Sequence, residues 1–127
     1  MKDYSNILTQ IKDSIYLNQK TKDENHFFFS SLLHFAISLE VGINTFKNTL
    51  ISYEKICIII PKRLGSRSTI QSILNEAVEL GYFEKITSSQ DKRVKNYKLS
   101  IGYTKMIENW TQDQKKIFSD NLINKVA

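Results

Sequence analysis

The sequence has little cysteine, proline and glycine, and each shortage excludes a class of protein. Its 127 residues include one cysteine, one proline, four glycines and two histidines. One cysteine cannot form an intramolecular disulfide and is too few for a cysteine-based metal site. One proline argues against flexible linkers and low-complexity tails. We therefore expect one ordinary globular domain over residues 1–127.

The signatures of membrane proteins, enzymes and metalloproteins are also missing. No stretch is apolar over the roughly eighteen residues that a membrane span needs, and the first thirteen residues do not resemble a signal peptide. There is no glycine-rich phosphate loop and no plausible Ser/His/Asp set. His26 and His34 lack acidic companions at ligand spacing. We expect a cytoplasmic protein without catalytic activity, metal, cofactor or membrane partner.

What the chain has is a concentrated positive charge. Residues 62–105 hold nine basic and four acidic side chains, while the remainder holds nine of each, so the whole formal net charge of +5 lies in this segment. Such a region attracts polyphosphates. Because a basic run alone is more often a solvated surface, charge indicates nucleic acid only in combination with a matching fold.

Residues 66–80 combine a buried face and a hydrogen-bonding face on one predicted helix. The apolar residues recur at helical spacing and the polar ones project opposite. The apolar set is Ile70, Ile73, Leu74, Ala77 and Val78; the polar set is Ser68, Gln71, Ser72 and Asn75. Gly81 offers a left-handed stop, and extended runs follow at 82–87 and 94–101 around a tip that contains Lys92 and Arg93. The helix fits a major groove, and the hairpin reaches phosphates or a minor groove.

Residues 66–100 resemble the recognition helix and wing of the MarR-type winged-helix regulators. The resemblance rests on the serine-rich helix start, the Glu-Leu-Gly-Tyr exit at 79–82, and Asp91-x-Arg93 ahead of a strand ending Lys-Leu-Ser at 98–100. It implies a mainly α (α+β) winged helix-turn-helix with a two-stranded β-wing, a core at 25–101 and helical flanks at 1–20 and 103–126. It also implies a homodimer that binds a palindromic site on double-stranded DNA and regulates transcription.

The helix start offers phosphate contacts, and the exposed face offers base contacts. Free amides with the hydroxyls of Ser66, Ser68 and Thr69 suit phosphate, although capping is an alternative role and either Ser66 or Ser68 can begin the helix. Arg67 suits guanine, while Gln71 and Asn75 suit adenine, with Ser72 as a lesser candidate. The alternative for this face is an ordinary solvated helix surface.

In the wing, we assign Lys92 and Lys95 to phosphates and Arg93 to a narrow minor groove. In MarR-type proteins the wing arginine commonly enters the minor groove, and the acidic residue two positions earlier helps to hold it. The matching residues here are Arg93 and Asp91. The alternative is an exposed hairpin with generic lysines.

Elsewhere the periodicity predicts four helices. They span 5–18, 26–41 with Gly42 as its end, 53–60 with Ser52 as its cap, and 103–126. The connection at 42–51 is open between loop and short helix. The first and last helices carry apolar stripes that suit a dimer interface, and packing onto their own domain is the alternative. This single C-terminal helix departs from the family, in which two are usual.

The aromatic cluster near residue 28 and the single cysteine each allow two interpretations. Family members often bind small phenolic compounds, which leaves a small-molecule effector open, and the aromatic residues 27–29 with His34 and Phe35 either line such a pocket or form plain core. Cys57, among isoleucines, is favoured as a buried hydrophobe over a redox sensor. A competing function is a winged-helix module that docks a protein, whose recognition face would need apolar anchors.

Replacing Gln71 tests base reading directly. We expect Gln71→Ala to change the preference between DNA sites by roughly 1–3 kcal/mol, because a bidentate contact to adenine distinguishes bases. Binding of the variant to a panel of duplexes measures this change. An equal loss of affinity on every duplex would refute the base-reading role.

Overall fold

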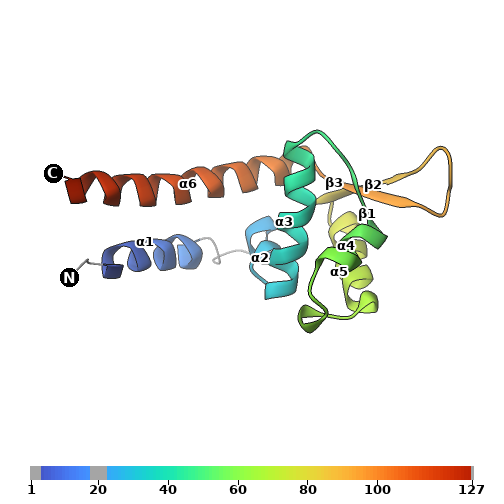
Figure 1. The fold of residues 1–127 in the computed structure, drawn as a ribbon, viewed down its shortest axis with the longest axis horizontal. Helices are drawn as coiled ribbons and strands as arrows, with labels where there is room; N and C mark the ends of the chain where they lie inside the picture. Colours follow the sequence, from blue (N-terminus) through green and yellow to red (C-terminus); the bar gives the residue numbers. More distant parts are fainter. Residues whose placement is uncertain (1–3, 18–22, 127) are drawn as a thin grey trace.

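The structure, a computed structural model, describes residues 4–17 and 23–126. Two long helices extend from one side of the globular part, and a hairpin projects from the other (Figure 1). The helices are α1 (Tyr4–Leu17), α2 (Glu24–Phe28), α3 (Leu32–Phe46), α4 (Tyr53–Ile59), α5 (Arg67–Glu79) and α6 (Ile101–Val126), with a 3-10 turn at Lys62–Leu64. The strands are β1 (Ile51–Ser52), β2 (Phe83–Thr87) and β3 (Lys95–Leu99). This order is that of a winged helix-turn-helix.

The two strands of the wing, β2 and β3, form a hairpin as predicted, and β1 adds a third strand, so the antiparallel sheet has the order β1-β3-β2. Strands β2 and β3 pair over their full length, from Phe83 opposite Leu99 to Thr87 opposite Lys95. The two residues of β1 pair with the inner part of β3, where Ile51 lies opposite Tyr97. A strand of two residues is too short to show an alternating pattern in the sequence.

The predicted single helix at 26–41 is wrong, because the chain forms two helices there, α2 and α3. The break covers residues 29–31, where the Ser31 hydroxyl accepts a hydrogen bond from the His34 amide at 3.1 Å and caps α3. Serine competes with helical backbone hydrogen bonds, which favours a cap here. The helix then runs through Gly42 to Phe46 instead of stopping, because buried Gly42 packs beside the side chains of Leu99 and Ile107.

The helix-turn-helix itself follows the sequence closely. The Ser52 hydroxyl caps α4 by accepting from the Lys55 amide at 3.1 Å, and Glu54 lies in the first turn, as predicted. The predicted helices 53–60 and 66–80 are each observed within about one residue at either end. Gly81 has a φ of 80°, the left-handed conformation that glycine tolerates best.

The core lies around α3 and is rich in aromatic side chains. Phe27 and Phe28 of α2 are buried, and their rings meet Tyr103 of α6 edge-on with centroids 6.1 and 6.4 Å away. Trp110 packs edge-on against Phe28 at 5.1 Å. The aromatic residues at 27–29 are therefore part of the core, as the simpler of the two interpretations held.

The two arms are α1 and α6, which lie side by side, and α6 extends from the end of β3 in the direction away from the wing tip (Figure 1). A side-chain hydrogen bond of 2.9 Å joins Asn6 of α1 to Asn121 of α6. None of residues 4–17 is fully buried in the single chain, although the helix carries an apolar stripe. The observed α6 is one continuous helix, as predicted, and among the described residues no helix is long and apolar enough to cross a membrane.

A buried hydrogen bond joins α3 to α6 within this core. The hydroxyls of Ser38 and Tyr103 lie 2.8 Å apart, and both residues are fully buried. Burial raises the pKa of Tyr103, so its hydroxyl stays neutral. The pair thus supplies a neutral polar link between two apolar helix faces.

We expect Tyr103→Phe to lower the free energy of unfolding by about 1–3 kcal/mol, because it leaves the Ser38 hydroxyl buried without its partner. Urea unfolding measures the loss. Combining it with Ser38→Ala should recover part of the stability, since both polar groups are then absent. Tyr16→Phe, at an exposed site, is the control. A loss in Tyr103→Phe no larger than in this control would contradict the prediction.

Candidate nucleic-acid interface

The start of α5 is organised by one serine hydroxyl. Ser66 is the N-cap: its Oγ accepts from the Thr69 amide at 3.2 Å, and it lies 3.0 Å from the hydroxyls of both Ser68 and Thr69. Of the two predicted starts, the structure has Ser66. Capping thus occupies Ser66, while the exposed Ser68 and Thr69 remain at the surface where an anion would meet the helix N-terminus.

Arg67, the first residue of α5, forms hydrogen bonds with the first turn of α4. Its Nη2 donates to Glu54 Oε1 at 2.6 Å, and its guanidinium lies 5.3 Å from the ring centroid of Tyr53. The Tyr53 hydroxyl also donates to the Arg67 carbonyl oxygen at 3.1 Å. The carboxylate raises the pKa of Arg67 further above its already high ordinary value. The sequence did not point to Tyr53 and Glu54, because they lie 14 and 13 positions before Arg67.

The outward face of α5 carries the other predicted base readers. Ser72 and Asn75 are exposed and Gln71 is half-buried, and the Gln71 amide donates to Asn75 Oδ1 at 3.0 Å. This bond fixes the relative orientation of two amides one helical turn apart. Each amide keeps further donor and acceptor capacity. The structure therefore presents these predicted side chains together on one face.

Behind Gln71 lies Tyr97 of β3. The Tyr97 side chain is buried, and no hydrogen-bond partner for its hydroxyl lies among the described residues. Burial raises the pKa of Tyr97, and the nearby Gln71 side chain opposes that shift in part. The proximity links the middle of the recognition helix to the root of the wing.

The wing tip holds its arginine with the neighbouring carboxylate. Arg93 Nε and Nη2 donate to Asp91 Oδ1 and Oδ2, both at 3.2 Å, and the Arg93 amide donates to Oδ1 at 3.0 Å. The Arg93 side chain is nevertheless 90% exposed. The structure thus has the geometry that the family resemblance implied, with an exposed guanidinium held by Asp91.

The two wing lysines differ in their surroundings. Lys92 is exposed, whereas the half-buried Lys95 donates from Nζ to the Lys92 carbonyl at 2.8 Å and lies 3.4 Å from the Thr87 hydroxyl. Lys95 therefore stabilises the tip of the wing, and its ammonium group lies against the backbone of the hairpin. Figure 1 shows this hairpin extending beyond α4 and α5, away from the arms.

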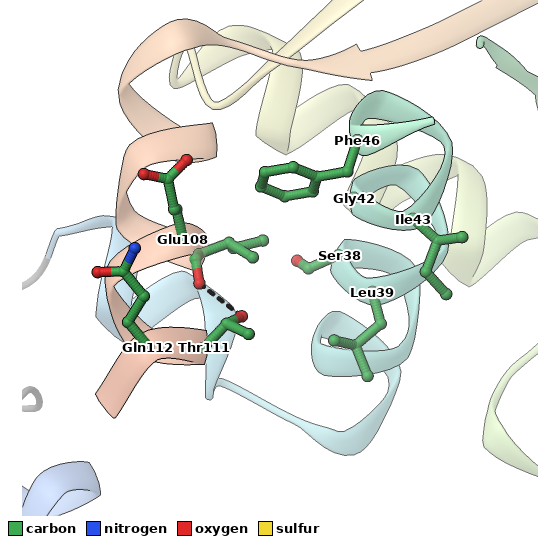
Figure 2. A pocket seen from close by; sticks show the side chains of 9 residues that line it. Ser38, Leu39, Gly42, Ile43, Phe46, Glu108, Thr111 and Gln112 are labelled. Carbon is green, nitrogen blue, oxygen red and sulfur yellow. Dashed lines mark hydrogen bonds between the residues drawn. The ribbon is translucent and has the colours of Figure 1, made fainter. Parts of the chain in front are cut away.

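A separate apolar groove lies between α3 and α6, with a volume of about 330 Å³ (Figure 2). Ser38 and Gly42 line it from α3, and the Phe46 side chain extends across it toward α6, which contributes Glu108 and Thr111. The aromatic cluster singled out in the sequence lies elsewhere, in the core. Over residues 4–17 and 23–126 no group of three or more metal-ligating side chains is placed to hold an ion.

The contact between Asp91 and Arg93 shifts the pKa of Asp91, and this shift can be measured. Its hydrogen bonds lower the pKa of Asp91 below the ordinary value of 3.8. Because the folded pKa is the lower one, the contact stabilises the fold above pH 3.8 and is lost as pH falls through the lowered pKa. We expect Arg93→Ala to raise the pKa of Asp91 toward 3.8 in a carbon-13 NMR titration. Lys92→Ala is the control and should leave it unchanged; equal pKa values in wild type and Arg93→Ala would contradict the assignment.

No protein-family model and no curated protein sequence matches this chain. Several solved structures do match it in shape. A MepR mutant from a multidrug-resistant S. aureus clinical isolate has 13% identity and a TM-score of 0.63, with 98% of this chain and 81% of that chain covered. NadR in complex with 4-hydroxyphenylacetate has 15% identity and a TM-score of 0.60, with coverage of 94% and 72%. The S. aureus MepR–DNA complex has 17% identity and a TM-score of 0.56, with coverage of 96% and 91%.

At such low identity, a likeness of this extent establishes a shared fold. The neighbours are MarR-family winged-helix transcriptional regulators. The chain has their winged helix-turn-helix fold, with α4 and α5 as the helix-turn-helix and β2–β3 as the wing.

Proposed function

We propose that this chain is a sequence-specific regulator of transcription that binds double-stranded DNA as a homodimer. The observation that carries the proposal is a polar recognition face on α5 next to an exposed, carboxylate-held arginine at the tip of the wing. The face of α5 offers hydrogen-bonding groups to a major groove, and the wing tip offers a guanidinium to a minor groove. The net charge of +5 lies in the same segment and favours phosphate contact.

The neighbouring structures support the proposal. MepR forms a complex with DNA, and its fold matches nearly the whole of this chain. The exposed residues of α5 are polar or charged over most of its length, which suits base edges better than the apolar anchors of a docked protein. A regulator of this kind has no catalytic step and acts in the compartment that holds its DNA.

The dimer is supported by apolar surface on the arms. Tyr4, Leu8 and Leu17 of α1 and Phe118 of α6 are large apolar side chains that are more than half exposed in the single chain. Such a surface gains stability when a second copy covers it. Two copies would present two recognition helices to the two half-sites of a palindrome.

The groove between α3 and α6 supports a small-molecule effector as part of this function. Its lining is predominantly apolar, with leucine, isoleucine and phenylalanine side chains. NadR, which shares the fold, has been solved with 4-hydroxyphenylacetate bound. A small aromatic effector bound in this groove is therefore part of the proposed function.

Selection of bound sequences from random duplex DNA across a salt series tests the function. We expect a two-fold symmetric selected site and an affinity that falls as salt rises, because counterions are released from DNA. Arg93→Ala should weaken binding by about tenfold and flatten the salt slope by about one. Lys116→Ala, which removes a positive charge from the exposed surface of α6, is the control. Failure of the wild type to bind any duplex at low salt would overturn the proposal.

A further inference from the structure

The side chain and carbonyl of Arg67 are both held by two consecutive residues of α4, the helix that precedes α5 and supports it. Glu54 accepts from the guanidinium, the Tyr53 ring lies beneath it, and the Tyr53 hydroxyl donates to the Arg67 carbonyl. These three contacts act on the first residue of α5, where the helix begins. They fix both the helix start and the direction of its first side chain.

The contacts restrict Arg67 without covering it. Its side chain remains 57% exposed and that of Glu54 66% exposed. The hydrogen bond to Glu54 uses one of the five N–H donors of the guanidinium, so a planar pair of donors remains for two acceptors. An arginine held in advance loses less rotamer freedom when it binds a guanine edge, which makes its contact more selective.

The charge of Glu54 has an opposite effect on general affinity. Since the fold brings this carboxylate to the start of α5, it repels phosphates at the surface where DNA would lie. An isolated exposed ion pair also contributes little to stability. A carboxylate here therefore costs general affinity, and its benefit is in orienting Arg67.

We infer that Glu54 and Tyr53 are positioning residues for base recognition: they hold the Arg67 guanidinium in the orientation that selects one base pair, and Glu54 exchanges general DNA affinity for selectivity. The inference rests on the proposed function and deepens it. It adds to the surface that would contact DNA two residues of α4, a helix for which the sequence predicted no DNA-contacting residue.

Glu54→Gln is the decisive variant, because it removes the charge while keeping the size of an exposed side chain. The base pair read by Arg67 is first identified as the one at which Arg67→Ala loses discrimination. We then expect Glu54→Gln to reduce discrimination at that base pair about fivefold and to raise affinity for unrelated duplex two- to threefold. Tyr53→Leu, which removes both the ring and the hydroxyl, should reduce the same discrimination.

Two controls separate positioning from charge. Glu79→Gln removes an equal charge at the far end of α5, so it should change affinity for all duplexes alike. In the Arg67→Ala background, Glu54→Gln should leave discrimination unchanged, because the residue it positions is gone. Thermal unfolding checks that each variant is folded.

The outcomes distinguish the inference from the function on which it rests. If the wild type selects a DNA site but Glu54→Gln behaves as Glu79→Gln does, the positioning role is overturned and the regulator stands. If Glu54→Gln shifts discrimination equally with and without Arg67, the coupling is overturned. If the wild type binds no duplex, both the proposed function and the positioning role are refuted.

Discussion

The burial of α3 is the constraint on which the rest of the structure depends. This helix contacts α2, α5, α6 and the sheet strands β1 and β3. Its buried side chains include Ile37, Ser38 and Val41, and Ser38 satisfies its hydroxyl with Tyr103 of α6. A polar group at this depth is stable only with a partner, so the hydrogen bond fixes how α6 leaves the domain.

From that centre, short polar contacts orient the surface that would meet DNA. Serine hydroxyls cap α3, α4 and α5, and each cap sets where its helix begins. Two arginines are then held by carboxylates, Arg67 by Glu54 across the helix-turn-helix and Arg93 by Asp91 within the wing. Each guanidinium stays exposed and restricted at once, which is the arrangement that selective recognition requires.

The fold was largely predictable, and its departures have local causes. The recognition helix, the support helix, the wing strands and the long last helix follow from apolar spacing and turn residues. The single helix predicted across 26–41 failed because the apolar run conceals the cap at Ser31. Gly42 failed as a stop because it lies buried within α3 beside Leu99 and Ile107, where tertiary packing outweighs the weak helix propensity of glycine. Strand β1 was not predicted because it has only two residues, too few for a recognisable pattern.

The sequence by itself determined the helix and hairpin of the winged part and the concentration of positive charge, because periodicity and composition are local properties, while the Asp91–Arg93 pair was implied by the family resemblance of that segment. Only the tertiary structure decided the contacts between residues distant in the chain. Glu54 reaches Arg67, Ser38 reaches Tyr103, and α3 and α6 enclose an apolar groove. These contacts depend on how helices cross and which faces they bury, and no pattern within a single segment encodes that geometry.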